Sequence, residues 1–413
     1  MPPTILQIIP QLDTGGAELS AVEITAAVVA AGGRAIVLSE GGRLVADIAA
    51  AGGEHVMFPA ASKNPVTMLA NARRLERLFA AESIDIVHAR SRAPAWSALL
   101  AARRAEIPFV TTYHGAYNET GPLKKLYNSV MARGDLVIAN SAYTAGLIKS
   151  RYGTPDDRLR IIHRGVDGGH FDPAIVAPQR VSALRASWGV PEHAPVVLQA
   201  ARLTGWKGQR VLIEAARILA ATGRLHDAHI VLAGDDQGRT SYAQTLRADI
   251  ARAGLADRIH LVGHVVDMAA AFATAHLAIV GSTEPEAFGR AATEAQVMSC
   301  PVIATRIGAP PETVLAPPDH DETTNTGWLV PPGDAAALAE AMARALARSG
   351  QDRAALGARA RAHVLAKFSL HVMKSKTLAV YDELIGTKLV SGFLCATDGK
   401  RAVHEKAENF FQA

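Results

Sequence analysis

Short apolar runs alternate with longer stretches of helical periodicity along most of the chain. Each run predicts a buried strand, because strands covered on both faces contain consecutive hydrophobic residues. The stretch Val66–Ala81 predicts an amphipathic helix, with Leu75 and Phe79 on one face and Arg73 and Arg77 largely on another. Alternation of this kind favours a parallel sheet between layers of helices. In the first part of the chain we expect a helix at Ala17–Ala31 and strands at Ile5–Ile9, Ala35–Leu38, Ile84–His88, Phe109–Thr112, Leu136–Ala139 and Arg160–Ile162.

The alternation is interrupted between Gly168 and Pro195 and then resumes. This segment is rich in proline and has little periodicity, which is typical of a junction between domains. The chain therefore predicts an α/β architecture with two doubly wound domains in tandem. In the second part we expect strands at Val196–Ala200, His229–Ala233, Ile259–Val262, Leu277–Val280, Val302–Ala304 and Gly327–Val330, and helices at Gly208–Thr222, Ser241–Ala253 and Ala335–Lys367.

Composition limits the classes of protein that fit. The 413 residues are 49% hydrophobic and 20% charged, as in globular proteins, and this length corresponds to two or three domains. A net charge of +4 is too small for a dedicated nucleic-acid binder. The two cysteines, Cys300 and Cys395, cannot build a disulfide framework. With no cleavable signal peptide and no uncharged apolar stretch of about 18 residues, we expect a cytoplasmic protein.

In open parallel sheets, ligands bind beyond the carboxyl ends of the strands. Gly15 and Gly16 follow the first predicted strand and open a helix, where free N–H groups suit an anion or a sugar hydroxyl. An ordinary tight turn would have the same sequence. Arg202 and Lys207 follow the first strand of the second part, and two cations five residues apart can hold one diphosphate. The alternative is a pair of solvated loop cations.

Two glutamates form the strongest pattern. Glu286 lies in the loop after the strand Leu277–Val280, and Glu294 lies in the helix that Gly289 opens. Carboxylates suit the vicinal hydroxyls of sugars, and the N–H groups near Phe288 and Gly289 suit phosphate or hydroxyl oxygens. Alternatively, Glu286 favours the helix N-terminus and Glu294 is a solvated helix residue. The apolar neighbours of Glu294 argue against the second possibility, since they predict a buried helix.

Together these motifs resemble those of the retaining GT-B glycosyltransferases of family 4, over nearly the whole chain. The most specific element is the pair Glu286 and Glu294, separated by seven residues that include Phe288. The second element is Arg202 and Lys207 on Ala-Arg-Leu-x-x-x-Lys-Gly. The resemblance implies the GT-B fold, in which two Rossmann-like domains face a cleft. It places an acceptor domain at 1–180, a nucleotide-sugar donor domain at 190–366, a closing helix at 367–386 that returns to the first domain, and a tail at 387–413 to which we assign no role.

The resemblance also implies a role for each matching residue. Glu294 would accept hydrogen bonds from the ribose, and Glu286 from the transferred sugar. Arg202 and Lys207 would neutralise the departing diphosphate, so no metal or other cofactor is expected. Further donor contacts would come from Gly16, from the N–H groups near Phe288 and Gly289, from the backbone of Val265 at the base, and from His114 after the strand Phe109–Thr112.

Some positions depart from the family pattern or have weaker support. Ala287 and Ala309 stand where the family usually has glycine, and both could narrow the sugar pocket. His114 also fits a histidine with satisfied hydrogen bonds at a strand end, and we assign it no proton transfer. His88 and Arg90 could border the acceptor.

The leading hypothesis is a retaining hexosyltransferase that moves a sugar from a nucleoside diphosphate to a glycan or lipid-linked acceptor in bacterial envelope synthesis, for instance of lipopolysaccharide. A GT-B-shaped nucleotide-sugar epimerase and a non-catalytic nucleotide-binding protein are the alternatives. No nucleic-acid partner is expected. Peripheral contact with the cytoplasmic face of the inner membrane is a further hypothesis, which rests on Arg73, Arg74, Arg77, Lys124 and Lys125.

Overall fold

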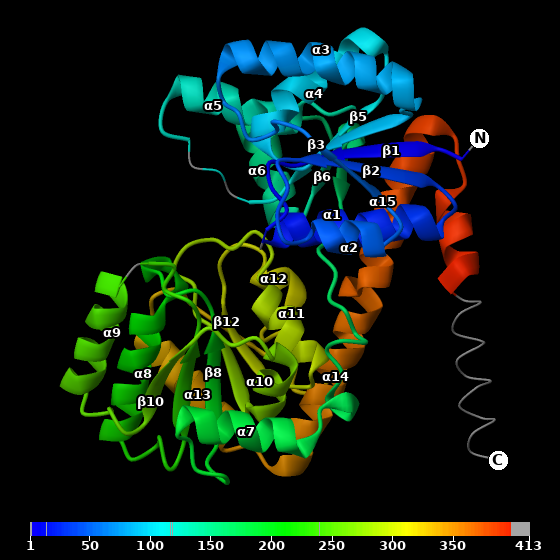
Figure 1. Cartoon of the computed structure of the whole chain (residues 1–413). Helices are drawn as coiled ribbons and strands as arrows, with labels where there is room; N and C mark the ends of the chain where they lie inside the picture. The colour runs from blue at the N-terminus through cyan, green and yellow to red at the C-terminus, as the bar shows by residue number, and fades with distance from the viewer. Residues whose placement is uncertain (1, 14, 116, 118, 239, 398–413) are drawn as a thin grey trace, which may run out of the picture. The chain divides into compact units, whose positions relative to one another are not determined.

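The computed structural model describes residues 2–13, 15–115, 117, 119–238 and 240–397. The chain divides into two compact units. Unit 1 comprises the chain up to His163 together with the chain from Leu370 onward, and unit 2 is Arg164–Ser369. Each unit is an α/β sandwich with a parallel sheet at its centre, as the alternation predicts (Figure 1).

The described part of unit 1 contains a seven-stranded parallel sheet in the order β3-β2-β1-β4-β5-β6-β7. The interior strand β1 pairs with β2 on one side and β4 on the other, through Ile5 opposite Ala35 and Ile86. Every carboxyl end therefore lies at the same edge. The strands are β1 (Thr4–Ile8), β2 (Arg34–Ser39), β3 (Glu54–Met57), β4 (Ile86–Ala89), β5 (Phe109–Tyr113), β6 (Leu136–Ala139) and β7 (Leu159–Ile161).

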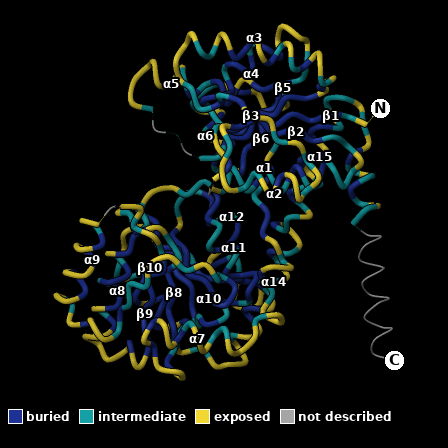
Figure 2. Tube along the Cα trace, in the orientation of Figure 1, coloured by how far each residue is buried: buried dark blue, intermediate teal, exposed yellow. Residues whose placement is uncertain are grey.

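Alternate residues of β1 enter two different cores of unit 1. Leu6 packs with Leu75 of α3 on one face of the sheet, and Ile5 packs with Ile24 of α1 and Tyr381 of α15 on the other. The buried sheet lies inside an exposed shell of helices (Figure 2). The helices of unit 1 are α1 (Gly16–Ala30), α2 (Val45–Ala50), α3 (Pro65–Glu82), α4 (Arg92–Ala105), α5 (Pro122–Ser129), α6 (Ala142–Tyr152) and α15 (Leu370–Ile385), and a 3-10 turn, η1, covers Val130–Ala132.

The segment after α15 also packs into unit 1. Residues 389–397 are helical, and Leu389 and Phe393 are buried in the same core as α1 and α15. The Asp382 carboxylate accepts hydrogen bonds from the N–H groups of Leu389 and Val390, at 2.7 and 2.9 Å, and so caps the start of this helix. Part of the predicted tail is therefore core structure, and residues 398–413 lie outside the described part.

The described part of unit 2 contains a six-stranded parallel sheet in the order β10-β9-β8-β11-β12-β13. Its strands are β8 (Val196–Ala200), β9 (His229–Ala233), β10 (Ile259–Gly263), β11 (Leu277–Val280), β12 (Val302–Thr305) and β13 (Trp328–Val330). The helices are α7 (Pro178–Trp188), α8 (Gln209–Ala221), α9 (Thr240–Arg252), α10 (Met268–Thr274), α11 (Arg290–Val297), α12 (Pro310–Thr313), α13 (Ala335–Leu346) and α14 (Gly350–Phe368).

The predicted helical stretch at Ala335–Lys367 is divided in the structure. The chain forms two helices there, because the Ser349 hydroxyl accepts a hydrogen bond from the Asp352 N–H at 3.1 Å and caps a new helix, α14.

The boundary between the two units lies before the predicted junction and before residue 180. Residues 164–180 belong to unit 2, where Val166 pairs with Ser369 and Phe171 is buried in the core.

Candidate active site

The loops that carry the predicted motifs meet at one edge of the unit 2 sheet. Strands β8 and β11 are hydrogen-bonded neighbours, and β12 lies on the other side of β11. All run parallel, so the loops that follow them lie side by side at the carboxyl edge. These loops contain Arg202 and Lys207 after β8, Glu286 after β11, and Gly308 after β12.

The loop after β8 is fixed by side chains at both of its ends. Gln199 donates to the carbonyl of Lys207 at 2.7 Å, and Gln209 donates to the carbonyl of Arg202 at 2.9 Å. Gly208 ends the loop with a φ of +76°, and a Cβ there would lie 1.9 Å from the carbonyl oxygen of Gly281. Only glycine fits this position, which brings the loop against the one after β11.

Lys207 and Glu286 form an ion pair across these two loops. Their Nζ and Oε1 atoms are 2.7 Å apart, and the side chains are only 16% and 11% exposed. The ammonium also lies 4.2 Å from the centre of the Trp206 ring, a cation–π contact. Burial of a charge is unfavourable unless an opposite charge pairs with it, so each of these two side chains depends on the other.

Glu286 is held through its backbone as well as its carboxylate. It forms a bridge with Gly308, and its carbonyl accepts a hydrogen bond from the Ala309 N–H at 2.9 Å. Gly308 has a φ of +74°, and a Cβ there would lie 2.4 Å from the carbonyl oxygen of Glu286. Glycine is therefore required at 308, whereas Ala309 contributes to this contact through its backbone.

A further contact to Glu286 comes from a residue that the sequence motifs do not include. Ser282, 1% exposed, donates from Oγ to Oε1 of Glu286 at 2.5 Å. Its own carbonyl accepts a hydrogen bond from the Thr305 hydroxyl at 2.7 Å. The only signal in the sequence is a small polar residue two positions after an apolar strand.

Arg202 has a different setting from Lys207. Its side chain is exposed, and Nη1 donates to Oε1 of Gln237, in the loop after β9, at 3.3 Å. The predicted cations therefore share a loop, but only Lys207 is paired with a carboxylate among the contacts described. The exposed guanidinium of Arg202 is available to an anion at this edge.

Glu294 lies on α11, which Gly289 precedes as the N-cap. Its side chain is 15% exposed, and Oε1 pairs with Nε of Arg290 at 3.1 Å. The alternative of a solvated helix residue is therefore wrong. Phe288 is buried in the unit 2 core, 6.1 Å from the Phe368 ring, so its side chain anchors the turn. Any ligand contact there falls to the backbone.

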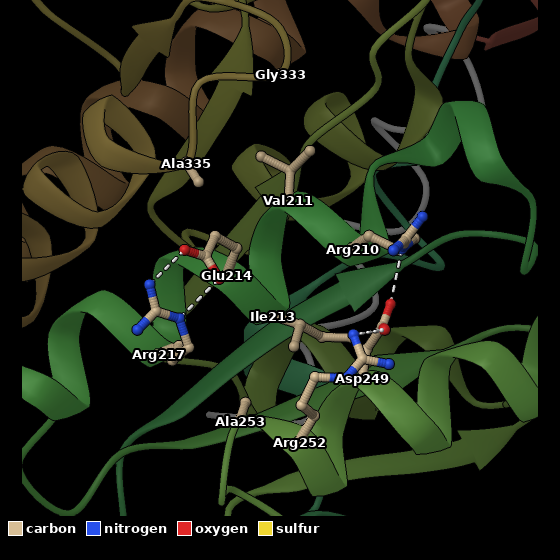
Figure 3. A pocket seen from close by; sticks show the side chains of 10 residues that line it. All are labelled: Arg210, Val211, Ile213, Glu214, Arg217, Asp249, Arg252, Ala253, Gly333 and Ala335. Atoms are coloured by element: carbon tan, nitrogen blue, oxygen red, sulfur yellow. Dashed lines mark hydrogen bonds and ion pairs between the residues drawn. The ribbon is translucent and has the colours of Figure 1, made fainter.

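Val265 follows β10 and is half-buried against the core of unit 2. It also lines a cavity of about 680 Å³ with Trp188 and His264. Another cavity, of about 450 Å³, lies between α8, α9 and the start of α13 (Figure 3). Its arginines pair with carboxylates in the cavity wall, such as Arg210 with Asp249 at 2.7 Å, and none of the predicted site residues lines it.

The predicted site residues of unit 1 lie at the carboxyl edge of its own sheet. Gly16 is the first residue of α1, directly after the loop that follows β1, and Thr14 lies outside the described residues. His114 follows β5, and its carbonyl accepts a hydrogen bond from Asn140 at 3.2 Å.

His88 and Arg90 are buried, at 0% and 3% exposure, which contradicts the expectation that they border an acceptor. His88 lies within hydrogen-bond distance of the Tyr381 hydroxyl of α15 and of the Thr112 hydroxyl, at 2.7 Å each. Burial lowers the pKa of His88 well below its usual value and raises the pKa of Tyr381 to about 12. This polar pair therefore serves the interior of unit 1.

The described residues contain no group of three or more histidine, cysteine, aspartate or glutamate side chains placed to hold a metal ion. The expectation that no metal is needed stays a prediction. In the same described part, none of the helices has the length and hydropathy to cross a bilayer.

Known proteins match both units. The model for Glycosyltransferase Family 4 matches residues 14–168, and the model for Glycosyl transferases group 1 matches residues 181–363. A D-inositol 3-phosphate glycosyltransferase of Xylanimonas cellulosilytica is 31% identical over 294 residues, which cover 67% of this chain and 67% of that protein.

Solved structures are similar over nearly the full length. A glycosyltransferase from Rickettsia africae has 34% sequence identity and a TM-score of 0.85, and the match covers 94% of this chain and 100% of that one. Anabaena Alr3699/HepE in complex with UDP and glucose has a TM-score of 0.77 at 23% identity, over 92% of this chain and 100% of that one, and shows the same fold. The chain is therefore a glycosyltransferase of the hexosyltransferase type, and it belongs to family 4 of the GT-B glycosyltransferases.

Proposed function

We propose that this glycosyltransferase transfers a sugar, with retention of its anomeric configuration, from a nucleoside diphosphate to a glycan or lipid-linked acceptor in bacterial envelope synthesis. The observation that carries the proposal is the Lys207–Glu286 ion pair, 2.7 Å long, with Arg202 exposed on the same loop. A cation that neutralises phosphate and a carboxylate that accepts from sugar hydroxyls thus lie next to each other. A nucleotide sugar presents the same two groups next to each other.

The proposed chemistry follows from where charge develops. When the bond between the sugar and the diphosphate breaks, negative charge accumulates on the leaving phosphate, and Arg202 and Lys207 stabilise it. These cations supply the charge that a metal ion supplies in other transferases, so we expect activity without a divalent metal. Glu294 accepts from the ribose through Oε2, because Arg290 occupies Oε1. For Gly16, His114 and Val265 the donor contacts implied by the family stay predictions.

The relatives support the donor and acceptor classes. The Anabaena structure contains UDP and glucose, and the Xylanimonas protein is named a D-inositol 3-phosphate glycosyltransferase. We therefore place a nucleotide sugar in unit 2 and a polar, hydroxyl-rich acceptor in the proposed reaction. Lipopolysaccharide as the product class and the cytoplasm as the compartment stay predictions.

Thermal shift with UDP-glucose, GDP-mannose and ADP-glucose tests the donor class, because a ligand that binds only the folded state raises the melting temperature. With the donor that binds, the Glu286→Ala variant should lose transfer to sugar and inositol phosphate acceptors. The control is Glu284→Ala, an exposed glutamate two residues away, which should keep the wild-type rate. Equal rates for both variants would refute the site, and an inverted anomeric configuration in the product would refute retention.

We also propose peripheral contact of unit 1 with an anionic membrane. Helices α3 and α5 both lie in the layer that contains α4 and η1, and both carry exposed apolar residues beside cations. In Figure 2 the first part of α5 is coloured as exposed. Apolar side chains that enter the headgroup region and cations that attract anionic lipid reinforce each other. The residues are Val66, Leu69, Leu123 and Leu126, with Arg73, Arg74, Arg77, Lys124 and Lys125.

A further inference from the structure

Within the described part of the chain, the carboxylate of Glu286 is held through one oxygen atom, Oε1. Ser282 Oγ and Lys207 Nζ both donate to Oε1, at 2.5 and 2.7 Å. Among the contacts of the described residues, none involves Oε2. The carboxylate therefore has a fixed side, which the protein occupies, and a second oxygen that is available to a ligand.

The two side chains that donate to Oε1 differ in charge and in conformational flexibility. Lys207 has a long flexible side chain, and a diphosphate carries more negative charge than the carboxylate, so a bound nucleotide competes with Glu286 for the ammonium. Ser282 is neutral and has no comparable attraction to phosphate. Its short side chain is 1% exposed, and Thr305 holds its carbonyl at 2.7 Å. Ser282 therefore stays in place when Lys207 turns toward a ligand.

We propose that Ser282 is the positioning residue for Glu286 in the donor-bound state, an inference that rests on the proposed function. Without a ligand, the carboxylate is held by Lys207 and Ser282 together. When the diphosphate of the donor engages Lys207, the Ser282 hydroxyl keeps Oε1 in place. Oε2 then stays directed at a hydroxyl of the transferred sugar, which Ser282 itself does not touch.

This role predicts that a Ser282 variant loses affinity for the nucleotide sugar but not for the free nucleotide. Removing the Ser282 hydroxyl should weaken the binding of a nucleotide sugar about tenfold, since a hydrogen bond to a charged group contributes about that much. Binding of the free nucleoside diphosphate should not change, because it lacks the transferred sugar that Glu286 contacts. If Ser282 had a merely structural role, its removal would weaken the binding of both ligands equally.

The test is calorimetry with matched pairs of probes: UDP-glucose with UDP, GDP-mannose with GDP, and ADP-glucose with ADP. The pair that the wild type binds is then measured for Ser282→Ala and for Ser282→Cys, which keeps the shape of the side chain with a larger and weaker donor. The control is Thr274→Ala, which removes another buried hydroxyl that donates to a helix carbonyl, of Ala270, at 2.8 Å. Thermal melting of each variant accompanies the titrations.

The inference is supported if both Ser282 variants lose affinity for the nucleotide sugar alone and Thr274→Ala does not. Equal binding of the nucleotide sugar by wild type and Ser282→Ala overturns it. An equal loss of affinity for the nucleotide sugar and for the nucleoside diphosphate also overturns it. Glu286→Ala separates this failure from that of the proposed function. If Glu286→Ala binds the nucleotide sugar like wild type, or if wild type binds none of the pairs, the proposed function itself fails.

Discussion

The backbone conformation of Gly208 determines where the charged side chain of Lys207 lies. It lies next to Lys207 in the left-handed region, and its Cα faces the carbonyl of Gly281 on the neighbouring loop. A side chain there would separate the two loops that the Lys207–Glu286 ion pair joins. The position of the cation therefore depends on a residue with no side chain.

Gly208→Ala should destabilise unit 2, because the left-handed backbone alone costs about 1–2 kcal/mol for alanine and the Cβ would lie 1.9 Å from the Gly281 oxygen. We expect the melting temperature to fall by several degrees. Gly205→Ala in the same loop is the matched control, since a Cβ there meets nothing within 4 Å. Calorimetric melting curves compare the two variants, and similar melting temperatures would contradict this account of the loop.

At the scale of elements, α3 and α5 are helices whose outer sides carry apolar residues that no core explains. Val66 is 75% exposed at the start of α3, and Leu123 is 82% exposed at the start of α5. Cations follow on both helices, which is the distribution that an anionic bilayer surface selects.

Changing both Val66 and Leu123 to serine should weaken binding to anionic liposomes roughly tenfold, because two apolar anchors are lost while the cations remain. Val266→Ser is the control, since Val266 is 85% exposed on unit 2. Sedimentation with vesicles of neutral and anionic lipid measures binding at low and high salt. Binding that does not respond to anionic lipid, to salt or to the double change would refute the membrane contact.

The sequence predicts some elements better than others. Strands β8, β9 and β11 have the predicted bounds, because each is an apolar run buried on both faces. Strand β3 lies at the edge of its sheet and is mostly exposed, so Glu54–Met57 has no such signal. The break between α13 and α14 depends on one serine cap in an alanine-rich stretch, where helical periodicity continues across the cap.

The sequence likewise predicts some features of the candidate site and not others. Residue types and spacing are enough to select Arg202, Lys207, Glu286 and Glu294. They do not show that Lys207 and Glu286 touch, because that contact depends on β8 and β11 being neighbours, a long-range feature of the sheet. Ser282 has no signal of its own, since a small polar residue after a strand is common in any turn.

At the scale of the whole molecule, unit 1 is built from two separate parts of the chain. Helix α15 supplies Leu378 and Tyr381, both 0% exposed, to a core that it shares with residues of the first 163 positions and with Leu389 and Phe393. Unit 2 is one continuous stretch. Shortening the chain from its end therefore affects the two units differently.

A chain that ends at Ser369 should lose the fold of unit 1 and keep that of unit 2. Limited proteolysis with mass spectrometry would then find a protected core at 164–369 and degradation of 1–163. A chain that ends at Gly386 is the graded comparison, since it keeps α15 and loses only Leu389 and Phe393 from that core. Equal protection of both units in the shorter chain would contradict the assignment of α15 to unit 1.

The split in unit 1 also sets an order of events on the ribosome. The first sheet emerges long before the helix that covers Ile5, Val110 and Ile138 on one of its faces. Unit 2, 206 residues from Arg164 to Ser369, is made in between, which takes on the order of ten to forty seconds. During that time α1 covers part of this face, and the part that α15 will cover stays an open apolar surface of the kind that chaperones bind. The second half of the protein can thus complete its fold before the first.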